Sequence, residues 1–135
     1  MRILIASPLG DVIAAPLNAK FADATITVAR DRAEFKRAID AQVRFDVVAA
    51  DLIFNRADLE WTFDGLDVID GLRKANRTAP VLLATQGHSM EEDHLAEARL
   101  RNDVAGVVAK ADGFQALATA MQTVALGQPM RAPVT

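Results

Sequence analysis

Apolar residues follow two patterns along the chain: short continuous runs, and longer segments in which they recur with helical period. The short runs cover residues 2–6, 24–29, 45–50, 81–85 and 104–109. Runs of this length predict strands of a parallel sheet that is covered by helices on both faces. Residues 24–29 alternate Thr with Ile and Val, which predicts a strand with one wetter face.

The segments between the runs predict five helices, which begin near Gly10, Asp31, Gly65, Ser89 and Asp112. Three of these starts have a capping side chain with Glu or Gln three residues later, which is typical of a helix N-terminus. Five βα units with right-handed crossovers give an α/β domain with a doubly wound, five-stranded parallel sheet.

The first helix is expected over about residues 10–21, with Val12, Ile13 and Leu17 on one face. Residues 52–64 lack a regular pattern, and a connection of this length is usually functional or mobile. We expect one domain over residues 1–128, followed by a linker or C-terminal tail at 129–135.

Composition excludes several classes of function. The net charge of −3 does not favour direct nucleic-acid binding, and the absence of Cys excludes disulfides and thiolate metal sites. No apolar segment is long enough to span a bilayer, and the start does not resemble a signal peptide. We therefore expect a cytoplasmic protein without membrane partners.

Three polar side chains follow three of the predicted strands: Asp51, Thr85 and Lys110. The carboxyl ends of parallel strands meet at one edge of the sheet, where open α/β folds have their binding sites. An anion, a hydroxyl and a cation at this edge predict a phosphate-receiving pocket. The first strand ends differently, in Ser7 and Pro8.

The ordered motifs resemble those of a response-regulator receiver domain of two-component signalling systems. The motifs are Phe45-Asp-Val-Val-Ala-Ala-Asp51, Asp64-Gly-Leu-Asp-Val-Ile69, Pro80-Val-Leu-Leu-Ala-Thr85 and Gly106-Val-Val-Ala-Lys110. Residues 110–127 are similar to the end of receivers that precede a helix-turn-helix DNA-binding domain. The resemblance covers nearly the whole chain and implies the flavodoxin-like (CheY-like) (βα)5 fold.

The resemblance also implies roles for the site residues. Asp51 would accept the phosphoryl group, Lys110 would neutralise a phosphate oxygen, and Thr85 would hydrogen-bond that oxygen. Val107 stands where the family has a switching Tyr or Phe. In the family, an acid pair after the first strand holds Mg²⁺.

This chain has Ser7 and Pro8 at the positions of the acid pair. Neither supplies an ionised oxygen, so Mg²⁺ binding is expected to be weak or absent and the receiver atypical. Asp58, Glu60 or Asp64 could fold back and replace the missing acids. Ser7 could donate a hydrogen bond to Asp51, or the Ser-Pro step could simply end the strand and begin a turn.

Three functional hypotheses remain open. The first is an atypical receiver, a regulatory and dimerisation module for transcriptional control and not an enzyme. It would dimerise through the fourth helix, the fifth strand and the fifth helix (residues 91–101 and 112–126), and reach DNA only through a separate C-terminal domain. The second is a competent receiver, phosphorylated at Asp51 by a histidine kinase. The third is a small-ligand sensor with Ser7, Asp51 and the 52–64 loop as walls.

Other residues carry weaker signals. His88 and His94 are more simply solvated histidines than metal ligands, because no third ligand accompanies either. Trp61 either pins the long loop to the core or contacts a partner.

Overall fold

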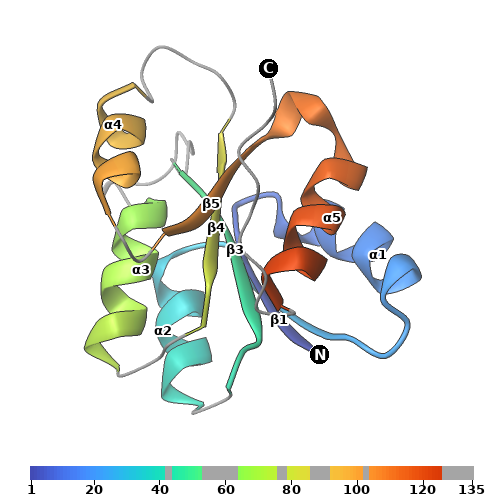
Figure 1. Cartoon of the computed structure of the whole chain (residues 1–135). Helices are drawn as coiled ribbons and strands as arrows, with labels where there is room; N and C mark the ends of the chain where they lie inside the picture. Colours follow the sequence, from blue (N-terminus) through green and yellow to red (C-terminus); the bar gives the residue numbers. More distant parts are fainter. Residues whose placement is uncertain (42–43, 53–63, 76–78, 86–91, 102–103, 126–135) are drawn as a thin grey trace.

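The structure is a computed structural model and describes residues 1–41, 44–52, 64–75, 79–85, 92–101 and 104–125. Five parallel strands form one sheet in the order β2-β1-β3-β4-β5 (Figure 1). The strands are β1 (Arg2–Ala6), β2 (Thr25–Ala29), β3 (Val47–Asp51), β4 (Val81–Thr85) and β5 (Val104–Ala109). The predicted α/β class and doubly wound sheet are confirmed.

Helices cover both faces of the sheet (Figure 1). One face carries α1 (Gly10–Lys20) and α5 (Phe114–Ala125), and the other carries α2 (Arg32–Asp40), α3 (Gly65–Lys74) and α4 (Glu92–Leu100). A single 3-10 turn, η2 (Lys110–Asp112), joins β5 to α5. Within the described ranges, no helix has both the length and the apolar character needed to cross a bilayer.

The sheet separates two apolar clusters, because successive strand residues point to opposite faces. Leu4, Val48 and Leu83 pack with the α2–α3–α4 side, whereas Ile3, Ile5, Val47 and Leu82 pack with the α1–α5 side. Phe35 and Leu72 fill the first cluster, and Leu17 and Met121 fill the second. β1 is buried after its first residue, as expected for a strand covered on both faces.

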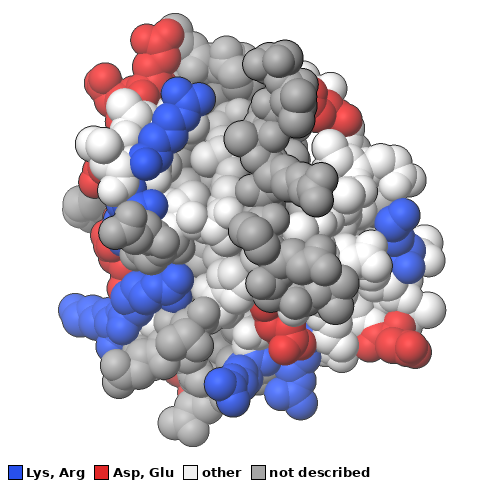
Figure 2. Space-filling view, viewed as in Figure 1, with Lys and Arg blue, Asp and Glu red and all other residues white. Residues whose placement is uncertain are grey.

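Charge is distributed unevenly over the helices. The α5 sequence contains no charged residue, whereas α4 contains three Glu or Asp and one Arg among its nine residues. In Figure 2 most Lys and Arg that face the viewer lie over α3, α4 and the lower edge. The two helices therefore differ in the character of the surface they can offer to a partner.

Side chains fix two helix starts close to the functional edge. The Asp31 carboxylate accepts a 2.8 Å hydrogen bond from the Glu34 backbone N–H at the start of α2. Asp64 and Asp67 form a full capping box at the start of α3. The predicted Asp112 cap is not observed, because Asp112 ends η2 and Gly113 directly precedes α5. Gly113 has a φ of 89°, a conformation that favours glycine.

Candidate functional site

Four of the predicted site residues lie at the carboxyl edge of the sheet. Ser7 follows β1, Asp51 is the last residue of β3, Thr85 is the last residue of β4, and Lys110 follows β5 in η2. The neighbouring strands are in register there, with Asp51 opposite Ala84 and Thr85 opposite Ala109. The sheet topology therefore assembles the site from segments far apart in the sequence.

Ser7, Asp51 and Lys110 form a polar cluster at this edge. The Ser7 hydroxyl donates a 2.7 Å hydrogen bond to Asp51 Oδ2, and Lys110 Nζ lies 2.9 Å from Asp51 Oδ1. The Asp51 side chain is 5% exposed and that of Lys110 is 28% exposed. A buried carboxylate requires such partners, since its desolvation is otherwise very costly. Each oxygen of Asp51 thus has a donor.

Ser7 also organises the turn after β1. Its backbone N–H donates to the Ala29 carbonyl, and its carbonyl accepts from the Gly10 backbone N–H, each at 3.0 Å. Its hydroxyl accepts a 3.1 Å hydrogen bond from the Leu9 backbone N–H. The two interpretations of Ser7 therefore hold together: it ends the strand, and it donates to Asp51. Pro8 occupies the turn between Ser7 and Leu9.

Thr85 ends β4 at the same edge as the polar cluster, and Val107 lies earlier in the neighbouring strand β5. Thr85 is 8% exposed. It takes no part in the hydrogen bond from Ser7 to Asp51 or in the ion pair between Lys110 and Asp51. Val107 pairs with Leu83 in the sheet and packs against the cluster on the α2–α3–α4 side. An aliphatic side chain there has no ring that could change rotamer with Thr85.

The alternative acids do not complete the site as far as the described residues extend. The Asp64 carboxylate accepts a 2.9 Å hydrogen bond from the Asp67 backbone N–H, so it serves as a helix cap. Asp58, Glu60, Trp61 and His88 lie outside the described residues, as does the side chain of His94. Within the described part of the chain, no three His, Asp or Glu side chains are grouped to hold a metal ion.

A charged network lies at the end of β2. The Arg30 guanidinium donates to Asp11 at 3.0 Å and to Glu34 at 2.9 Å. The side-chain hydrogen bond from Arg30, and then its backbone N–H, lower the pKa of Glu34 from 4.5 to about 2. In the α3 capping box the opposite occurs: burial and the neighbouring Asp64 charge raise the pKa of Asp67.

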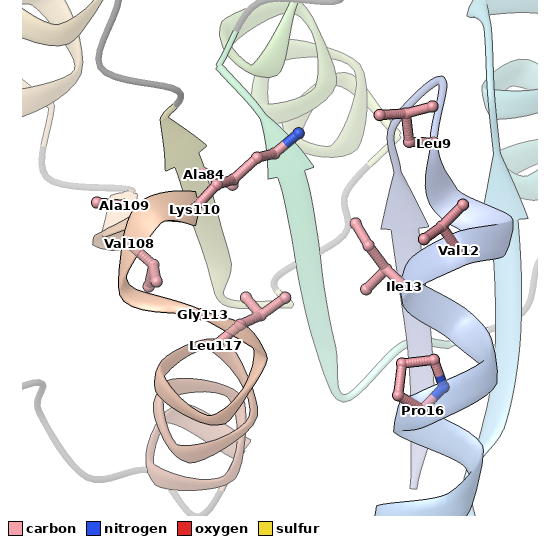
Figure 3. A pocket seen from close by; sticks show the side chains of 10 residues that line it. All are labelled: Leu9, Val12, Ile13, Pro16, Ala84, Val108, Ala109, Lys110, Gly113 and Leu117. Atoms are coloured by element: carbon pink, nitrogen blue, oxygen red, sulfur yellow. The ribbon is translucent and has the colours of Figure 1, made fainter.

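An apolar pocket of about 360 Å³ adjoins the polar cluster between α1 and α5 (Figure 3). The sequence pattern does not predict this pocket, because it places Val12 on the same helix face as Ile13 and Leu17. Leu17 is fully buried, whereas Val12 is 70% exposed and lines the pocket. A second apolar pair with i, i+4 spacing, Val12 and Pro16, was the available signal.

No protein-family model matches the sequence, and no curated protein sequence matches it significantly. Solved structures do match. The N-terminal domain of a response regulator/sensory box/GGDEF three-domain protein from Carboxydothermus hydrogenoformans has a TM-score of 0.71 at 16% identity, covering 93% of this chain and 94% of that chain. A CheY-like response regulator receiver domain protein from Methanospirillum hungatei has a TM-score of 0.69 at 16% identity, covering 94% of each chain.

The chain has the receiver-domain fold.

A third structure with the same fold was solved with Mg²⁺ bound. The response regulator TrrA from Thermotoga maritima, solved in complex with Mg²⁺ and BeF, has a TM-score of 0.62 at 18% identity, covering 91% of this chain and 97% of that chain. Mg²⁺ prefers carboxylate, phosphate and water ligands in strict octahedral geometry. In the present chain the Ser7 hydroxyl is neutral and already donates to Asp51. The described residues therefore do not fit Mg²⁺.

Proposed function

We propose that the protein is a signalling module of the response-regulator type, an atypical receiver that works without ordinary Mg²⁺-dependent phosphorylation. In this proposal the module acts by binding partners and is not an enzyme. The alternative, a competent receiver phosphorylated at Asp51 by a histidine kinase, is the outcome that the experiment below is designed to detect.

The hydrogen bond from Ser7 to Asp51 carries the proposal. Phosphorylation requires one carboxylate oxygen to attack phosphorus in line with the leaving group. Here Oδ2 accepts from Ser7 and Oδ1 faces Lys110, and the side chain is 5% exposed. Both interactions lower the nucleophilicity of the carboxylate, and the burial of its side chain limits the approach of a phosphate donor.

The charge at the site also supports the proposal. Phosphoryl transfer depends on positioning and on neutralisation of the oxygens of the transferred group. Lys110 is one cation, and its charge is already offset by Asp51 at 2.9 Å. With Ser7 and Pro8 in the acid-pair positions, no second carboxylate at the end of β1 would recruit a divalent ion.

The wider role extends this proposal. We infer a receiver-like domain over residues 1–128 and a linker or tail at 129–135. The domain would form a homodimer through α4, β5 and α5 and regulate transcription through a separate C-terminal DNA-binding domain in the cytoplasm. The uncharged α5 and the charged α4, on opposite faces of the sheet, support an association surface with an apolar part and a polar part.

Intact-mass measurement after incubation with acetyl phosphate and Mg²⁺ tests the proposal. We expect no added phosphoryl group on the natural chain, and none on Asp51→Ala. Stoichiometric phosphorylation of the natural chain that Asp51→Ala abolishes would overturn the proposal and establish the competent receiver.

Ser7→Asp and Ser7→Asn form a matched pair in the same assay. Asp adds a carboxylate at the end of β1, so Mg²⁺ should now bind and promote labelling of Asp51. Asn has nearly the same size but no charge, and should stay unlabelled. Equal labelling of the two variants would contradict the role given to the missing acid.

A further inference from the structure

The apolar pocket between α1 and α5 is formed by four parts of the chain. Leu9 comes from the turn after β1, Val12, Ile13 and Pro16 from α1, and Leu117 from α5, with the ends of β4 and β5 as the floor (Figure 3). Its volume of about 360 Å³ lies at the small end of the range for small-molecule sites. The lining includes neither Ser7 nor Asp51, in contrast to the ligand site expected from the sequence.

The rim of the pocket leaves large apolar side chains in water. Leu9 is 58% exposed and Val12 is 70% exposed, and they are two of the four exposed large hydrophobic residues in the described part of the chain. A molecule seated between α1 and α5 would cover both side chains and gain the free energy of removing that surface from water.

Lys110 gives the pocket one polar end. It is the single charged residue among the ten described residues that line the pocket, and its side chain runs along the rim toward Leu9 (Figure 3). An ammonium group has three N–H donors, and Lys110 Nζ lies 2.9 Å from Asp51 Oδ1. A ligand that covers Lys110 removes water from its other donors, so it must offer an acceptor oxygen in exchange.

The charge of that acceptor follows from Asp51. The Asp51 carboxylate already offsets the Lys110 charge, so a ligand carboxylate would bring a second anion to one cation. Like charges in a partly buried site repel strongly. A neutral oxygen, as in an amide, ketone or ester, satisfies the Lys110 donors without this repulsion.

We propose that this pocket binds a small uncharged organic molecule with an apolar body and one carbonyl oxygen directed to Lys110. The ligand would act as an input signal, because Lys110 contacts both the pocket and Asp51. The lining includes neither Ser7 nor Asp51, so binding to the unphosphorylated chain can be tested separately from the proposed function.

Titration with hexanamide, followed by backbone amide NMR shifts of the full chain, tests the site. We expect saturable shifts at Val12, Gly113 and Leu117, with a dissociation constant in the millimolar range for so small a probe. Hexanoate, which has the same apolar body and a carboxylate, should bind at least threefold more weakly. Equal or tighter binding of hexanoate would overturn the assignment of a neutral ligand.

Val12→Ser and Leu100→Ser are matched variants for the same titration. Both residues are exposed apolar helix positions, Leu100 at 85% exposure on α4, so neither substitution should unfold the protein. Val12→Ser should weaken hexanamide binding about fivefold through lost apolar contact, and Leu100→Ser should leave it unchanged. Equal effects of the two variants, or no saturable shift, would overturn the proposal. Shifts that follow protein concentration and not hexanamide would also overturn it, and would identify a second copy as the occupant.

Discussion

The polar cluster and the apolar pocket are neighbours at the same edge of the sheet, yet they are opposite in character. In the polar cluster, the Asp51 carboxylate is buried and each of its oxygens has a donor. In the pocket, Leu9 and Val12 remain in water. Lys110 belongs to both regions, through its charge in one and its position at the rim in the other.

The difference teaches where this receiver fold retains capacity to bind. A buried polar group whose hydrogen bonds are satisfied gains little from a new partner, whereas exposed apolar surface gains from being covered. Hence the polar cluster around Asp51 is the region whose hydrogen-bonding groups are better satisfied. The pocket beside it leaves apolar surface in water and so gains more from a bound partner.

The largest expected effect tests how tightly the chain is packed around the polar cluster. A Cβ at Gly65, the first residue of α3, would lie 2.8 Å from the backbone oxygen of Asp51 and 2.5 Å from Leu83 Cδ2. We expect Gly65→Ala to lower the free energy of unfolding by about 3 kcal/mol, because the strand carbonyl cannot move aside. Urea denaturation followed by circular dichroism measures the change.

Gly113→Ala is the control on the pocket side. A Cβ there would meet no atom within 4 Å, but the φ of 89° is unfavourable for alanine. We expect a loss of about 1 kcal/mol from backbone strain alone. If Gly113→Ala lowers the free energy of unfolding as much as Gly65→Ala does, the contrast between a tightly packed polar cluster and an open pocket is wrong.

The next effect sharpens the role of the polar cluster in stability. Ser7→Ala removes the donor to Asp51 Oδ2 and the acceptor for the Leu9 N–H, so unfolding should become about 2 kcal/mol easier. Asp51→Asn keeps the side-chain volume and should cost about 1 kcal/mol, because Lys110 loses its ion pair but stays partly hydrated. Thermal and urea unfolding test both variants. A gain in stability from Asp51→Asn would mean that the desolvation cost of the buried carboxylate exceeds what its pairing contributes.

The smallest effect compares the buried ion pair with an exposed one. The Glu34 pKa is lowered from 4.5 to about 2 by Arg30, so the folded state holds this proton less tightly than the unfolded state. The resulting stability is present above about pH 4.5 and is lost as the pH falls toward 2. Because the Arg30 side chain is 47% exposed, solvent screens the pair and we expect its effect to be the smallest of this series.

Glu34→Gln should therefore be less stable than the natural chain at pH 7, with the difference shrinking as the pH falls from 4.5 toward 2. Unfolding curves across this pH range test the expectation. Glu97→Gln, at an exposed position of α4, is the control for replacing a surface carboxylate by an amide. A constant difference for Glu34→Gln would exclude the carboxylate charge as its cause.

Periodicity predicted most of the fold, because the strands are nearly uninterrupted apolar runs and the Asp31 cap has a standard spacing. It did not reveal the α3 capping box, whose second member, Asp67, is neither Glu nor Gln. Apolar spacing alone also misassigned Val12, since only the packing of α1 decides which of two adjacent stripes is buried. The pattern of apolar residues along the chain does not distinguish the buried stripe from the exposed one.

The polar cluster was predictable only in part. Strand ends identified Asp51 and Lys110, because parallel strands bring their carboxyl ends to one edge. The partner of Asp51 could not be chosen in the same way, since Ser7 is 44 residues away in sequence and a Ser-Pro step usually means only a turn. Asp58 and Glu60 of the 52–64 loop lie outside the described residues.

The uncharged sequence of α5 has a consequence for how copies of this chain would meet. The α5 sequence has no charged side chain that could form an ion pair for dissolved salt to screen, whereas α4 carries three acidic residues and one Arg. Association through α5 would thus persist from dilute buffer to concentrated brine, and association through α4 would weaken along that series. Measuring association at increasing ionic strength can therefore tell which helix forms the main contact between copies.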